Sequence, residues 1–159
     1  MFIIRFSWPG ESYFFIGGNG MKQNESSLTS LVSAFGRAYH SKCDTPKIFD
    51  DYIAKDLISQ EEFSAISNNM IEGIQFFNSE IGQRFKDNRE EILKWVTQVQ
   101  LSPTPLARAA FCENVLFNEV NLGLKQYVIL GAGLDTFCFR HPELENSLEI
   151  FEIDYPATQ

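Results

Sequence analysis

Two glycines and one aspartate have the residue types and the spacing of a nucleotide-binding turn. Gly131 and Gly133 directly follow the apolar run Tyr127–Leu130, and Asp154 ends a second apolar run about 20 residues later. Glycine allows the backbone to turn tightly and a ligand to approach it closely. An acid at the end of the next strand can accept hydrogen bonds from ribose hydroxyls. The pattern predicts a ribose-binding site, and the alternative is a plain turn beside a solvated acid.

The residues after Gly133 distinguish between two cofactors. Leu134, Asp135 and Thr136 follow it, so the third glycine of the dinucleotide fingerprint is missing. That glycine normally allows close packing of helix and strand beneath a pyrophosphate, a group that S-adenosylmethionine lacks. The sequence therefore favours S-adenosylmethionine. A nicotinamide-dependent oxidoreductase and a non-enzymatic helical interaction module remain as alternatives.

Two strands must position these residues. Tyr127–Leu130 is a short, continuous apolar run, which is typical of a strand buried on both faces of a parallel sheet. Leu148–Ile153 predicts a second strand, and Leu134–His141 between them predicts a short helix that Pro142 ends. A strand, a glycine turn, a helix and a strand form the start of a doubly wound α/β sheet.

The preceding hundred residues carry helical periodicity. Ser26 and Ser27 are suitable caps, and Ser59 with Glu62 forms an S-x-x-E capping box. Gly123 suits the C-terminal turn of the last helix. We expect helices over Leu28–Tyr39, Tyr52–Ile58, Phe63–Phe77, Ile92–Val99 and Thr104–Leu122, the last one with Thr104 as its cap and Pro105 at its first position, after a break at Ser102-Pro103.

These elements divide the chain into three parts. Residues 1–25 are expected to be an N-terminal extension outside the fold, because Pro9 and Gly10 split its apolar pieces. We expect its first 20 residues to be dispensable for stability, and no basic region marks a signal peptide. Residues 26–123 form a helical region, and residues 124–159 begin a cofactor-binding domain.

Composition narrows the function classes. The 159 residues are 44% hydrophobic and carry a net charge of -8, which predicts a globular protein that is a poor partner for nucleic acid. No apolar run approaches the roughly 20 residues that span a membrane. The three cysteines form no C-x-x-C pair, and His40 and His141 have no ligand-like neighbours, so we expect reduced thiols, no metal site and a cytoplasmic protein.

The string Val128–Thr136 (VILGAGLDT), with Arg140 and Phe151–Asp154 (FEID) after it, resembles the leucine carboxyl methyltransferase family. The segments Leu106–Ala109 and Ser30–Asp51 are also similar to that family, so the likeness covers roughly residues 26–159. The resemblance implies a Rossmann-like fold of S-adenosylmethionine-dependent methyltransferases, here preceded by a helical segment and cut after the second strand.

The resemblance also implies residue roles. Arg108 would bind the carboxylate of the methionine moiety, Gly131 and Gly133 would line the cofactor, and Asp154 would hold the ribose. Arg37 and Arg140 are expected instead to form surface ion pairs, the commoner role of a lone arginine in a helix.

The reaction would be O-methylation of a carboxylate or a hydroxyl on a small molecule or peptide. A carboxylate needs no general base, so no residue is predicted to be catalytic. The family's sheet has seven strands and this chain supplies two, so we expect the chain alone to be incomplete and inactive.

Overall fold

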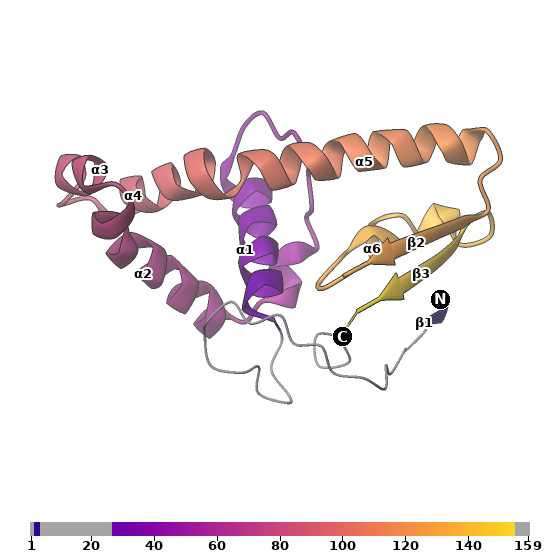
Figure 1. Cartoon of the computed structure of the whole chain (residues 1–159), viewed down its shortest axis with the longest axis horizontal. Helices are drawn as coiled ribbons and strands as arrows, with labels where there is room; N and C mark the ends of the chain where they lie inside the picture. The colour runs from indigo at the N-terminus through magenta and orange to yellow at the C-terminus, as the bar shows by residue number, and fades with distance from the viewer. Residues whose placement is uncertain (1, 4–26, 155–159) are drawn as a thin grey trace, which may run out of the picture.

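The computed structural model describes residues 2–3 and 27–154. A group of helices lies at one end and a small sheet at the other, and the long helix α5 runs along both (Figure 1). The helices are α1 (Leu28–Cys43), α2 (Gln60–Phe77), α3 (Ser79–Arg84), α4 (Arg89–Trp95), α5 (Pro103–Asn121) and α6 (Phe137–Arg140), with short helical turns η1 (Ala54–Leu57), η2 (Val96–Leu101) and η3 (Pro142–Leu144). The strands are β1 (Phe2–Ile3), β2 (Gln126–Leu130) and β3 (Glu149–Ile153).

Helix α1 is the centre of the helical group. Phe35 and Tyr39 are buried in one cluster with Ile58 and Ile66, as the helical periodicity of Leu28–Tyr39 predicted, whereas Leu28 itself is 70% exposed. The side chain of Ser27 does not cap the helix; its hydroxyl lies 2.7 Å from the hydroxyl of Thr29 instead. A second apolar cluster joins α2 to α4 and η2, so α2 is packed along most of its length.

The capping box predicted at the start of α2 is confirmed. The Glu62 amide donates to the Ser59 hydroxyl at 3.1 Å, and the Ser59 amide donates to the Glu62 carboxylate at 2.8 Å. Both orphan amides are satisfied, which fixes where α2 begins after the irregular segment that holds Asp51.

The prediction for the helices on either side of Ser102 was partly wrong. After α4 the chain continues as a π-helical stretch, η2, in which the Ser102 amide donates to the carbonyl of Thr97. Helix α5 begins at Pro103, two residues before the expected first position at Pro105. The reason is that Pro103 itself occupies the first turn, where a missing N–H has no cost.

The two predicted strands are confirmed and lie parallel. Tyr127 pairs with Ile150 and Leu130 with Ile153, and β1 pairs with the other edge of β3, giving the order β1-β3-β2. Strand β1 is a third strand that the sequence analysis did not predict, and it comes from the segment expected to lie outside the fold. The rest of the predicted extension 1–25 lies outside the described residues, so its dispensability stays a prediction.

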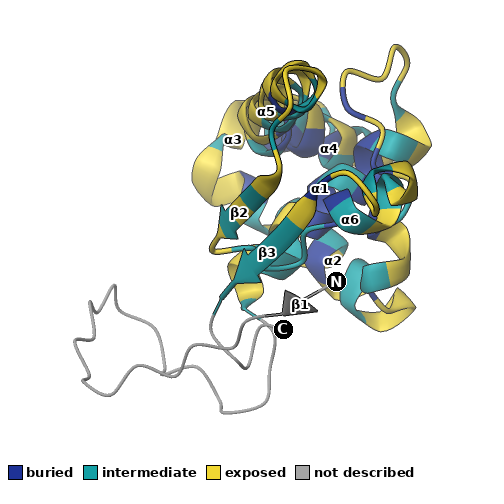
Figure 2. Ribbon diagram, turned by 90° about the vertical axis from the view of Figure 1, so that its right-hand side faces the viewer, coloured by how far each residue is buried: buried dark blue, intermediate teal, exposed yellow. Residues whose placement is uncertain are grey.

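Burial of β2 differs from the prediction. Alternate residues of β2 are half-buried, among them Tyr127, while Val128 and Leu130 are exposed, 49% and 76%. The covered face packs on Leu116 of α5 and on Phe137. In Figure 2 both β2 and β3 are coloured intermediate or exposed along their length. Within residues 2–3 and 27–154 no element covers the opposite face, which is why the strand is buried on one face only. No helix in the described ranges is long and apolar enough to cross a membrane.

Replacing Ser59 by alanine should lower the free energy of unfolding by about 1 kcal/mol, because α2 loses its cap. Ser64→Ala is the matched control: Ser64 is exposed within α2, where alanine is a better helix former, so no loss is expected. Urea denaturation followed by circular dichroism measures both. Equal losses in the two variants would show that the capping box does not stabilise the fold.

Candidate functional site

The glycine turn lies at the carboxyl end of β2. Gly131 and Gly133 both have left-handed backbones, with φ of 69° and 58°, where residues with a Cβ are strained. The amides of Gly131 and Ala132 donate to the carbonyl of Ile153, so the turn folds back over the end of β3. Apart from Gly131 and its two chain neighbours, no atom of the described residues lies within 4 Å of where a Cβ at Gly131 would be, so this side of the turn is open to a ligand.

Asp154 lies against the turn. Its carboxylate accepts a hydrogen bond of 2.5 Å from the Gly133 amide, which orients the acid at the end of β3. The structure therefore brings Gly131, Gly133 and Asp154 together, as the spacing predicted. Ligands of open α/β sheets bind at the carboxyl ends of the strands, where these three residues lie.

Ser30 is a neighbour of the turn that the sequence analysis missed. A Cβ on Gly133 would come within 2.7 Å of the Ser30 hydroxyl, so Gly133 is needed for the close approach of α1 as well as for its backbone angle. No local pattern could reveal this contact, because the two residues are about a hundred positions apart.

Asp135 closes the turn and starts α6. Its carboxylate accepts a 2.7 Å hydrogen bond from the Phe137 amide. Burial raises the pKa of Asp135, although the Phe137 amide and the nearby charge of Arg37 oppose this shift. The amide of Phe137, the first residue of α6, therefore already donates to a carboxylate.

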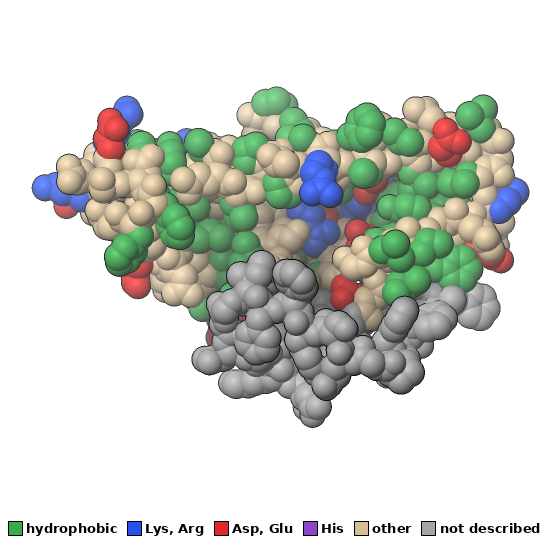
Figure 3. Space-filling view, in the orientation of Figure 1, with side chains coloured by type: hydrophobic (Ala, Val, Ile, Leu, Met, Phe, Trp, Pro, Cys, Tyr) green, Lys and Arg blue, Asp and Glu red, His purple; other side chains and the backbone are tan. Residues whose placement is uncertain are grey.

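A buried network of charges lies behind the turn. The Asp51 side chain is fully buried; it is 3.0 Å from Nη1 of Arg37 and accepts a 2.7 Å hydrogen bond from the Thr136 hydroxyl. Arg140 lies 3.6 Å from Asp51 and forms an ion pair with Glu113 of α5. Figure 3 shows cationic and acidic side chains together in the recess beneath the middle of α5.

The expectation of surface ion pairs at Arg37 and Arg140 was wrong, since both pair with buried Asp51. Their side chains are only 12% and 6% exposed. Burial lowers the pKa of Arg37 despite the nearby Asp51. Burial also acts to lower the pKa of Arg140, but the hydrogen bond and charge of Glu113 and the charges of Asp51 and Asp135 together raise it. The sequence could not show these buried ion pairs, because Asp51 and Arg140 are far apart in the chain and meet only in the folded structure.

Arg108 lies apart from this network. It is exposed on α5 and lines an open hollow of about 420 Å³ with Ala107 and Phe111. It makes no hydrogen bond or ion pair with any residue in the described part of the chain. Its guanidinium is therefore available to a ligand, but the role implied by the family resemblance stays a prediction.

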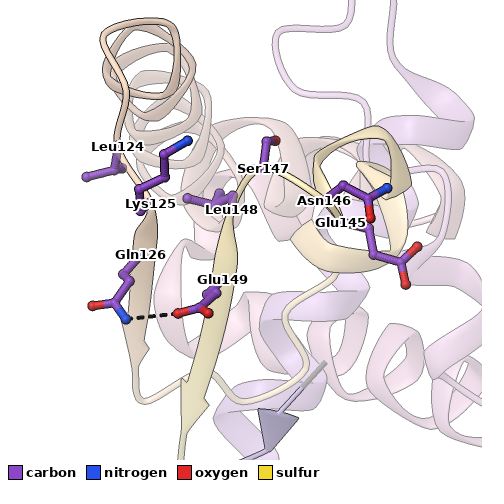
Figure 4. Close-up of a pocket in the computed structure, with 8 residues that line it drawn as sticks. All are labelled: Leu124, Lys125, Gln126, Glu145, Asn146, Ser147, Leu148 and Glu149. Atoms are coloured by element: carbon purple, nitrogen blue, oxygen red, sulfur yellow. Dashed lines mark hydrogen bonds between the residues drawn. The ribbon is translucent and has the colours of Figure 1, made fainter.

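The hollow drawn in Figure 4 lies at the opposite end of the strands from the glycine turn. Lys125, Gln126 and Glu149 line it, with a hydrogen bond of 2.9 Å from the Gln126 amide group to Glu149. This end holds the starts of β2 and β3. In parallel α/β sheets the chemistry lies at the carboxyl ends, so we do not assign this hollow to the site.

Cys138 and Glu152 form a contact beside α6. The thiol sulfur lies 3.6 Å from the Glu152 carboxylate, and burial together with that charge raises the pKa of Cys138 to about 11. A thiol with this pKa is protonated at neutral pH and is a poor nucleophile. Within the described ranges no three His, Cys, Asp or Glu side chains come together as a metal site.

Comparison with known proteins defines the class of the chain. The family model for leucine carboxyl methyltransferase matches residues 30–159, and the chain belongs to this family. It is 72% identical over 139 residues to a Bacillus subtilis (strain 168) protein named "Putative S-adenosyl-L-methionine-dependent methyltransferase YktD", a match that covers 87% of this chain and 46% of the relative.

A Mycobacterium marinum protein named "Putative S-adenosyl-L-methionine-dependent methyltransferase" is 25% identical over 141 residues, which cover 80% of this chain and 38% of that protein. The chain thus spans less than half the length of the curated relatives it matches. No solved structure matches it.

The glycines can be tested as a pair. Gly131→Ala should cost roughly 1–2 kcal/mol through the left-handed backbone alone, while Gly133→Ala should cost more because its Cβ also meets Ser30. Ser30→Ala removes the hydroxyl and should recover part of the loss in Gly133→Ala and none in Gly131→Ala. Urea unfolding of the three single variants and of the two double variants that combine Ser30→Ala with each glycine change measures these free energies. Equal costs for the two glycine changes, with no recovery by Ser30→Ala, would contradict the contact between Gly133 and Ser30.

Proposed function

We propose that this chain supplies the cofactor-binding start of an S-adenosyl-L-methionine-dependent methyltransferase, within a Rossmann-like domain of the family. The observation that carries the proposal is the glycine turn with Asp154 held against it at the carboxyl ends of β2 and β3. The names of both relatives support the same cofactor.

The geometry suits a nucleoside better than a dinucleotide. The open side of Gly131 allows a ligand to approach the backbone, and Asp154 is oriented to accept hydrogen bonds from ribose hydroxyls. A pyrophosphate would need the first amides of the helix after the turn. The Phe137 amide already donates to Asp135, and the ionised Asp135 carboxylate would repel a pyrophosphate. This contact disfavours a nicotinamide dinucleotide.

Arg108 is our candidate for the methionine carboxylate of the cofactor. An arginine can bind a carboxylate through two parallel hydrogen bonds and stays charged. Arg108 is exposed and has no ion-pair partner in the described ranges, so no internal contact must break before it binds. We assign cofactor binding to Arg108, Gly131, Gly133 and Asp154.

S-adenosyl-L-methionine supplies an activated methyl group when bound. The protein then has mainly to orient the acceptor toward that methyl group. We propose O-methylation of a carboxylate or hydroxyl on a small molecule or peptide in the cytoplasm, without nucleic acid or membrane as a partner. A carboxylate acceptor is nucleophilic at neutral pH, so no side chain needs to take a proton.

Cofactor binding is tested by calorimetry with S-adenosylhomocysteine and with NADH. The substitutions are made in this chain and, at the aligned positions, in YktD. Arg108→Ala and Asp154→Ala should each weaken S-adenosylhomocysteine binding about tenfold or more, because each removes a hydrogen bond to a charged group worth roughly 1.5–3 kcal/mol. Lys125→Ala, at the far end of β2, is the control. Binding of NADH alone would overturn the proposal.

The type of product is tested with methyl-labelled S-adenosylmethionine and a panel of carboxylic acids, phenols and short peptides. A methyl ester loses its label in mild base, whereas a methyl ether keeps it. Label on oxygen is the expected result for YktD: base-labile label if the acceptor is a carboxylate, or base-stable label if it is a hydroxyl. Label on nitrogen only would refute O-methylation while leaving the cofactor assignment intact.

A further inference from the structure

The second half of the glycine turn is held by the helical region and not by the sheet. The Leu134 carbonyl accepts a 2.5 Å hydrogen bond from Nη2 of Arg37, and the Leu134 side chain packs against the apolar cluster around Phe35. Thr136 donates its hydroxyl hydrogen to Asp51. Each partner precedes the turn by more than 80 residues.

The two terminal nitrogens of the Arg37 guanidinium group make different contacts. Nη1 faces Asp51 at 3.0 Å, while Nη2 reaches the Leu134 carbonyl. The planar group fixes these two directions relative to each other, which a lysine ammonium does not do. Its third donor, Nε, is buried without a hydrogen-bond partner in the described part of the chain, so Arg37 is placed for the other two contacts.

Asp51 links the arginine to the rest of the turn. Its two oxygens accept from the Thr136 hydroxyl and from the Ala54 amide, and Arg140 lies 3.6 Å away. Arg140 in turn donates to the Thr136 hydroxyl at 3.0 Å. The position of Thr136 is therefore fixed by two charged groups that come from different segments.

We propose that Arg37 and Asp51 are positioning residues for cofactor binding: by fixing the Leu134 carbonyl and the Thr136 hydroxyl, they hold Gly131, Gly133 and Asp154 in their binding arrangement. The inference rests on the proposed function. Neither residue borders the open side of Gly131, so neither is assigned a contact with the cofactor.

The test compares Arg37→Met, Arg37→Lys and the control Arg89→Met, which removes an exposed arginine bonded to Asn68 between α2 and α4. S-adenosylhomocysteine affinity is measured in YktD at the aligned positions, at a temperature where every variant is folded. Arg37→Met should weaken binding at least tenfold and Arg37→Lys by less, while the control leaves it unchanged.

Hydrogen exchange on this chain without ligand gives a readout independent of the cofactor. Arg37→Met should speed exchange in peptides covering residues 131–137 and leave α2 unchanged. Unchanged exchange over 131–137, or equally faster exchange in α2, would overturn the inference, since the second pattern is general destabilisation. If wild-type YktD does not bind S-adenosylhomocysteine, the proposed function fails, and the exchange data still decide whether Arg37 holds the turn.

Discussion

The carboxylate of Asp51 is the constraint on which the rest of the structure depends. It is fully buried, and a buried charge without partners costs several kcal/mol. Arg37, Arg140 and Thr136 surround it, and each comes from a segment that must be in place before Asp51 can leave water. Burial of this one group therefore ties the helical region to the segment that follows β2.

The shape of the glycine turn depends on these contacts of Asp51. On one side the turn is bonded to the end of β3, through the Ile153 carbonyl and Asp154. On the other side it meets Ser30, Arg37 and Asp51 of the helical region. Two glycines alone would leave a flexible loop; here both flanks are fixed, so the open side of Gly131 keeps a defined orientation.

Local patterns predicted the parts of this arrangement that depend on neighbouring residues. The capping box at Ser59, the helix α1 and the strand–glycine–strand order all follow from short-range chemistry, and the structure has them. The charge network did not follow, because Asp51 and Thr136 lie 85 positions apart and no spacing rule joins them. The π-helical stretch before Ser102 and the one-sided burial of β2 also depend on tertiary packing. The role of Arg108 rests on the family resemblance, because no local pattern separates a ligand-binding arginine from a solvated one.

The most direct test is a double-mutant cycle between Asp51→Ala and Thr136→Val, read as the free energy of unfolding in urea. Thr136→Val removes the hydroxyl that bonds to Asp51, and if Asp51→Ala does not fold, Asp51→Asn takes its place in the cycle. The account predicts a coupling energy of about 1 kcal/mol or more, typical of partners in one buried network. Additive effects, with coupling below about 0.3 kcal/mol, would contradict the claim that Asp51 holds the glycine turn to the helical region.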